Sequence, residues 1–154
     1  MPATTPSTHR GSRLDPLELG AWRGFLRVHA ALSRELDAEL LAAHDLPLSS
    51  YEVLLFLGDS HGGHMRMAEL ADSVLLSRSG LTRLVDRLER DGLVQRVSCP
   101  GDARGVHAQI TDAGRARFKE ARKTHLDGVR RLYLDHLDDD EKRELAALWE
   151  RMSS

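Results

Sequence analysis

The sequence is poor in several residue types, and each shortage excludes a class of protein. Its single cysteine, Cys99, rules out an internal disulfide and is typical of a reducing compartment. Aromatic residues make up 5% of the 154 residues, so a core must be built mainly from Leu, Val and Ala. No uninterrupted apolar run approaches the roughly 20 residues that span a bilayer. We therefore expect one domain, located in the cytoplasm and without membrane contact.

Motifs that carry catalysis or hold a cofactor are missing as well. The sequence contains no Gly-rich phosphate loop, no Cys-x-x-Cys, no His-Glu-x-x-His and no supported Ser/His/Asp arrangement. The eight histidines include His61 and His64 in one loop and His125 and His136 further along, but apart from Asp59 near the first pair, neither pair has further ligands at metal-binding spacing. We expect neither an enzyme nor a bound metal or cofactor, and we interpret Cys99 as a structural or incidental thiol.

Net charge gives no support for a nucleic-acid partner. The formal charge is −2, and residues 64–110 hold seven basic against six acidic side chains, a net charge of only +1. All seven basic residues of that segment are arginines, the side chain best suited to bidentate contact with phosphate or guanine. DNA binding must therefore be judged from where these arginines lie.

Long amphipathic helices are predicted at both ends of the chain, after a flexible tail at residues 1–14. Asp15 and Pro16 form a helix start, and apolar residues then recur three and four apart to about His44. Thr111 is expected to cap a further helix, and residues 138–140 to begin the last one. The apolar faces of these helices can be buried in a monomeric bundle or against a second copy of the chain. A two-fold dimer is the more economical solution.

Between the terminal helices, the pattern predicts a helix-turn-helix followed by a hairpin. Ser49 and Ser50 are expected to cap a short helix, and residues 64–66 can form a minimal strand. Residues 67–74 form another short helix, and Ser77 caps a longer one that runs to about Arg90 with apolar residues at helical spacing. Residues 93–98 and 106–110 then form two strands joined by a Pro/Gly loop.

The polar face of the helix that Ser77 caps carries the candidate DNA contacts. Hydroxyl groups at a helix N-terminus suit phosphate oxygens, and arginines reach base edges in the major groove. At the hairpin tip, Arg104 is placed to enter the minor groove and Asp102 to hold its guanidinium. The alternative is a solvated helix face and a surface ion pair. The predicted DNA-binding residues are Ser77, Arg78, Ser79, Thr82, Arg83, Arg87, Asp102 and Arg104.

At these residues the chain resembles the MarR family of bacterial winged helix-turn-helix regulators. The resemblance extends over roughly residues 15–152, and it rests on the stretches 70–71 (LA), 76–79 (LSRS), 82–89 (TRLVDRLE), 92–94 (GLV), 102–105 (DARG) and 110–114 (ITDAG). Two positions depart from the family pattern. Gly80 stands where a larger residue is more common, and Ala103 leaves one arginine at the hairpin tip where many relatives have two.

The resemblance implies a mainly α fold with a small β-hairpin wing. In such a fold, residues 64–110 are the winged helix-turn-helix DNA-binding lobe, and residues 15–45 and 112–152 are the dimerisation helices. The implied function is that of a homodimeric cytoplasmic regulator, associated with the nucleoid when bound and usually a repressor. It would bind a palindromic double-stranded operator and be released by a small-molecule effector. The alternative is a winged-helix module that binds DNA without sequence preference or contacts another protein.

Effector pockets in this family lie between the first long helix and the DNA-binding lobe. Trp22, Arg23, Arg27 and His29 lie on that helix and are therefore candidate effector-binding residues. Two arginines beside aromatic rings would suit an aromatic anion such as a phenolic acid.

Overall fold

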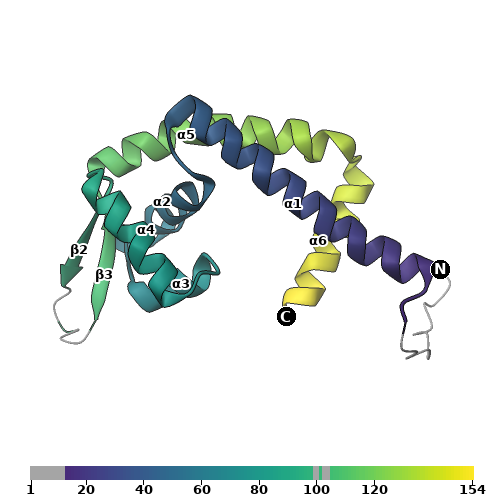
Figure 1. Cartoon of the computed structure of the whole chain (residues 1–154), viewed down its shortest axis with the longest axis horizontal. Coiled ribbons are helices and arrows are strands. Elements are labelled where there is room, and N and C mark those ends of the chain that lie inside the picture. The colour runs from purple at the N-terminus through teal and green to yellow at the C-terminus, as the bar shows by residue number, and fades with distance from the viewer. Residues whose placement is uncertain (1–12, 99–100, 102–104) are drawn as a thin grey trace.

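Helices dominate the computed structural model, which describes residues 13–98, 101 and 105–154 (Figure 1). Cys99, Asp102 and Arg104 lie outside these residues, so what the sequence predicts for them stays a prediction. The elements follow the predicted order of a mainly α chain with one hairpin. They are α1 (Pro16–His44), α2 (Leu48–Asp59), the 3-10 turn η1 (His61–Gly63), β1 (His64–Arg66), α3 (Met67–Ser73), α4 (Arg78–Arg90), β2 (Val94–Ser98), β3 (Val106–Ile110), α5 (Asp112–Leu132), the 3-10 turn η2 (Leu134–His136) and α6 (Asp139–Ser153).

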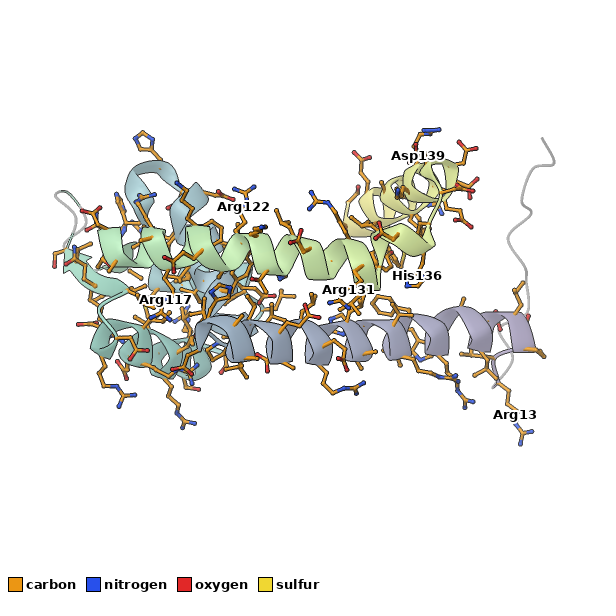
Figure 2. The ribbon with its side chains drawn as sticks, turned by 90° about the horizontal axis from the view of Figure 1, so that it is seen from above. Arg13, Arg117, Arg122, Arg131, His136 and Asp139 are labelled. Carbon is orange, nitrogen blue, oxygen red and sulfur yellow. The ribbon has the colours of Figure 1, made fainter. Side chains whose placement is uncertain are left out.

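These elements form two regions of different shape (Figure 1). The first, which we call the lobe, comprises α2, α3, α4 and an antiparallel sheet with the strand order β1-β3-β2. The second, the arm, comprises α1, α5, η2 and α6 and extends away from the lobe. Within the arm, the C-terminal part of α1 lies beside α5 (Figure 2), and the two helices diverge toward the start of α1 (Figure 1). Arg131 of α5 donates to Glu39 of α1 and helps to join the two helices.

Reciprocal side-chain caps fix where the arm helices begin. The carboxylate of Asp15 accepts from the Glu18 N–H at 2.8 Å, while the Glu18 carboxylate accepts from the Asp15 N–H at 2.8 Å. Asp138 and Glu141 repeat this capping box at the start of α6. Each box satisfies two backbone donors that a helix start leaves without partners. Both predicted starts are confirmed.

The predicted cap of α2 is wrong. This helix begins at Leu48 with Pro47 at its N-cap, and no side chain caps it locally. Instead, the Asp37 carboxylate of α1 accepts from the Leu48 N–H at 2.8 Å. Ser50 lies inside the first turn and is buried, at 1% exposure. Because the acceptor comes from another helix, a local sequence pattern cannot reveal it.

Most of the buried apolar side chains belong to the lobe. The remainder are Leu40 of α1, Leu46 between α1 and α2, and Ala121 of α5. By contrast, α6 has no buried residue, and α1 buries only Leu40. The core is built from aliphatic side chains, as the scarcity of aromatics predicts, and Tyr51 is its one buried aromatic among the described residues.

The sheet fastens the hairpin to the lobe. Val94 of β2 lies opposite Ile110 of β3, and His64 of β1 lies opposite Gln109 of β3, which confirms both the hairpin and the minimal strand. The Nδ1 atoms of His64 and His107 are 3.1 Å apart, so one imidazole donates to the other. His64 thus belongs to the contact between β1 and β3.

A strained leucine forms the turn between α3 and α4. The Leu76 N–H donates to the Ala71 carbonyl at 3.0 Å and the Leu75 N–H to the Asp72 carbonyl at 3.4 Å, the hydrogen bonds of a Schellman motif. Leu75 occupies the left-handed position of this motif with a φ of 57°. Glycine is the usual residue there, and a side chain in this conformation costs about 1–2 kcal/mol. Leu75 is 90% exposed, so packing within the chain does little to offset the cost.

Within the described residues, no single helix is both long and apolar enough to cross a membrane. Only α1 and α2 taken together meet the length and composition, and the two helices meet at a bend of 83°. Over the same residues, no three His, Cys, Asp or Glu side chains are grouped as metal ligands would be.

Candidate nucleic-acid interface

Helix α4 has an apolar face that holds it in the lobe and a polar face that is exposed. Leu81, Leu84, Val85 and Leu88 are at most 6% exposed and contribute to the core. The polar face carries every residue of this helix that the sequence predicts to contact DNA. All of them, with the N-cap residue, are exposed: Ser77, Arg78, Ser79, Thr82, Arg83 and Arg87.

The start of α4 is tightly capped. Ser77 Oγ accepts from the Gly80 N–H at 3.0 Å and lies 3.3 Å from Ser79 Oγ. A Cβ atom at position 80 would come within 3.1 Å of Ser77 Oγ, so glycine leaves room for the cap. Thr82 Oγ1 donates to the Arg78 carbonyl at 2.8 Å. The departure at Gly80 therefore accompanies a well-formed first turn, whose remaining N–H groups and positive helix end suit an anion such as phosphate.

Arg96 ties strand β2 to the polar side of α4, and the sequence reasoning missed it. Its Nη1 donates to Glu89 and its Nη2 to Asp86, each at 2.7 Å, and its side chain is only 29% exposed. Burial opposes the charge of the guanidinium, but the hydrogen bonds and negative charges of the two carboxylates outweigh burial and raise the pKa of Arg96. The bridge holds the root of the hairpin against α4.

The Arg96 bridge changes the charge that α4 presents to solvent. Both acidic residues of the helix, Asp86 and Glu89, are occupied by Arg96. Over the described part of the chain, the four arginines of α4 have no carboxylate within 4.0 Å. Arg83, Arg87 and Arg90 border one shallow hollow of about 340 Å³. A segment with a net charge of +1 therefore presents a cationic helix face.

Helix α4 and the hairpin border a second hollow, of about 470 Å³. Arg78 and Thr82 of α4 line it together with Arg96 of β2 and with Gly105 and Val106 at the start of β3. A duplex held on this surface would meet the helix and the base of the hairpin at once. Asp102 and Arg104, predicted for the hairpin tip, lie outside the described residues.

The predicted effector residues are only partly brought together. An apolar groove of about 510 Å³ lies between α1 and α6, with His29, Phe25 and Trp149 among its lining residues. His29 is the one predicted effector residue on this groove. Trp22 is 53% exposed with its ring centroid 6.2 Å from that of Phe25, and Arg23 and Arg27 are exposed outside the lining.

The contact between Phe25 and Trp149 was also missed. Their ring centroids lie 5.7 Å apart and join the start of the arm to its end. The available signal was the apolar spacing of Leu145, Leu148 and Trp149, which marks the face of α6 that lines the groove.

Comparison with known proteins shows what this chain is similar to in sequence and structure. A sequence model of the MarR family matches residues 44–105. The HTH-type transcriptional regulator PecS of Dickeya dadantii (strain 3937) is 28% identical over 127 residues, covering 82% of this chain and 75% of PecS.

Two solved structures from Streptomyces coelicolor are similar over nearly the whole chain. AbsC, a MarR family transcriptional regulator, superposes with a TM-score of 0.87 at 31% identity and covers 93% of this chain and 96% of its own. Sco3205, a MarR family transcriptional regulator solved in complex with DNA, superposes with a TM-score of 0.86 at 31% identity and covers 92% of each chain.

Proposed function

The chain belongs to the MarR family of DNA-binding transcriptional regulators, and on that premise we propose that it is a homodimeric repressor of an inverted-repeat operator. The exposed face of α4 carries the proposal. Its four arginines have no carboxylate partner among the described residues, while Arg96 occupies both acidic residues of the helix. In this proposal, α4 enters the major groove and Arg104 reaches the minor groove.

The homodimer is proposed because the arm leaves apolar side chains uncovered. Trp22, Phe25 and Val28 of α1 are 46–53% exposed, and Trp149 and Met152 of α6 are 39% and 69% exposed. Large apolar patches of this kind commonly mark contact surfaces. A two-fold axis through the arm would cover the same patch on both copies and present two α4 helices to one duplex.

Release by a small molecule is proposed for the same arm. The groove between α1 and α6, which the second copy would border, offers an apolar lining and the imidazole of His29, which favours an aromatic ligand bound beside the subunit contact. Arg23 and Arg27 lie on the same helix and would supply positive charge for an anionic one. Quenching of Trp22 fluorescence by a panel of aromatic carboxylates tests this, and no response across the panel would count against it.

The DNA interface is tested by titrating arginine variants against the intergenic DNA upstream of the gene. Arg83→Ala removes one α4 contact, and we expect roughly tenfold weaker binding and a salt slope reduced by about one. Arg104→Ala should weaken binding by roughly tenfold or more while the dimer persists. Arg143→Ala is the matched control, because that arginine is exposed on α6 and pairs with Asp140 at 2.7 Å.

The same titration separates a sequence-specific regulator from the alternative module. A specific regulator prefers its own upstream DNA over random duplex by roughly 4 kcal/mol or more. One salt-steep affinity for both duplexes would instead indicate non-specific binding. Unchanged affinity in both Arg83→Ala and Arg104→Ala would overturn the proposed interface.

A further inference from the structure

Leu75 combines two unfavourable features at one position of the helix-turn-helix. Its backbone is left-handed, with a φ of 57°, and its side chain is 90% exposed, more than that of any other large apolar residue among those described. It directly precedes Leu76 and the α4 cap Ser77. Strained backbone of this kind concentrates at sites where it positions a group for binding.

The turn itself does not require leucine. Its two hydrogen bonds run between main-chain atoms of Leu75, Leu76, Asp72 and Ala71, and any residue supplies them. Glycine or asparagine would adopt the left-handed conformation at lower cost. The leucine side chain is also almost fully outside the lobe, so neither the backbone nor the core explains it.

We propose that Leu75 contacts DNA and packs on apolar carbons of the duplex, either deoxyribose or the 5-methyl group of thymine. The inference rests on the proposed docking of α4 in the major groove. That docking brings the start of α4 to the duplex, and Leu75 lies only three residues before Arg78, where the helix begins. The predicted contacts on α4 are hydroxyl and guanidinium groups, whereas thymine methyls are recognised by apolar side chains. Leu75 supplies an apolar side chain beside these polar groups.

Substitutions at position 75 separate the backbone from the side chain. Leu75→Gly and Leu75→Asn relieve the backbone and remove the apolar group. We expect both to raise Tm by about 2–4 °C and to weaken operator binding by roughly three- to tenfold. Leu75→Met keeps an apolar side chain and should retain both Tm and affinity. Leu75→Ala should weaken binding without raising Tm, since it keeps a Cβ in the left-handed conformation.

An operator in which uracil replaces thymine shows whether Leu75 contacts deoxyribose or the 5-methyl group of thymine. If Leu75 contacts a thymine methyl group, the replacement should weaken operator binding by the native protein more than it weakens operator binding by Leu75→Gly. If deoxyribose is the contact, both proteins respond equally to the replacement. Either result supports the proposal, provided that Leu75→Gly binds the natural operator more weakly than the native protein does.

Arg83→Ala, measured in parallel, separates failure of this inference from failure of the proposed interface. Unchanged affinity in Leu75→Gly alongside weakened binding in Arg83→Ala would overturn the role of Leu75 alone. Unchanged affinity in both would overturn the interface and the inference together. Equal loss in Leu75→Met and Leu75→Gly would assign the effect to the turn, and dissociation of the dimer would assign Leu75 to a protein contact. Either of these results would contradict the proposal.

Discussion

The lobe and the arm differ in how far they bury their apolar residues within one chain. In the lobe, α4 places Leu81, Leu84, Val85 and Leu88 at no more than 6% exposure against neighbouring elements of the same chain. In the arm, α6 buries no residue. The lobe is therefore complete within one chain, whereas the arm offers apolar surface that a single chain leaves uncovered.

This difference separates two requirements of a DNA-binding regulator. The surface that we propose meets DNA must keep its shape, and the dense packing under α4 and the Arg96 bridge serve that need. The surface that sets the spacing of two such lobes can be supplied by a second copy, and the exposed apolar residues of the arm fit that role. The comparison predicts that the two regions respond differently to substitution.

The largest effect is expected from a charge placed in the apolar groove of the arm. Phe25 is 46% exposed in the single chain and contacts Trp149, so Phe25→Glu leaves the lobe intact. A carboxylate buried without a partner in the proposed interface costs roughly 3 kcal/mol or more. We expect dissociation of the dimer and at least about a hundredfold weaker operator binding, measured by light scattering and gel shift.

Ala146→Glu provides the control for this variant, because Ala146 is exposed on α6 and does not line the groove. It should leave both dimer and affinity unchanged. A dimer that survives Phe25→Glu would show that the groove lies outside the subunit contact.

A second contrast compares two glycines, one at the junction of the lobe with α5 and one in the arm. A Cβ at Gly114 would lie 2.1 Å from the Leu93 carbonyl oxygen, a backbone atom that also accepts from the Thr111 N–H at 3.1 Å. Gly114→Ala should therefore lower the free energy of unfolding by about 2–3 kcal/mol. A Cβ at Gly20 would have no neighbouring atom within 4 Å, so Gly20→Ala should raise the free energy of unfolding by roughly 0.5–1 kcal/mol.

Urea unfolding at one fixed protein concentration measures both glycine variants, because dimerisation makes stability concentration-dependent. Equal changes in the free energy of unfolding for Gly114→Ala and Gly20→Ala would contradict the contrast between a tightly packed lobe and a loosely covered arm.

The smallest effect concerns acid stability where α5 packs on the lobe. The His125 ring lies 4.5 Å from the Tyr51 ring between centroids, its Nδ1 is buried without a hydrogen bond, and burial lowers the pKa of His125. Below about pH 6.5 the unfolded chain takes up a proton that the folded chain refuses. As the pH is lowered, the free energy of unfolding should therefore decrease until the pH is below the lowered pKa of His125. His125→Gln should remove that part of the slope.

Glu52 acts in the opposite direction and makes the paired comparison necessary. Burial raises the pKa of Glu52, although the charge of His29 lowers it. Stability from its retained proton is present at low pH and is lost as the pH rises above its ordinary value of 4.5. Only the difference between the native protein and His125→Gln in the slope of unfolding free energy against pH reports on His125. Identical slopes for the two proteins would contradict the prediction.

What the sequence predicted correctly was encoded locally. Helix starts at Asp15, Ser77, Thr111 and Asp138 follow from caps that accept from a backbone N–H three residues ahead. The apolar face of α4 follows from helical spacing, and the hairpin from the Pro/Gly loop between its two strand-like runs. Such signals lie within a few residues of the feature they predict.

What the sequence could not predict depends on residues brought together by the fold. The capping of Leu48 by Asp37, the bridge from Arg96 to Asp86 and the ring contact of Phe25 with Trp149 each join different elements. The left-handed Leu75 escaped notice because Val-Leu-Leu-Ser carries no glycine to mark the turn. The same limit explains why a net charge of +1 gave no hint of a cationic face.

The mass of the protein in solution tests the account most directly. Light scattering should give twice the chain mass of 17.2 kDa for the free protein, and two chains per duplex on the upstream inverted repeat. A mass of one chain at concentrations that saturate the operator would contradict the proposal that the arm requires a second copy.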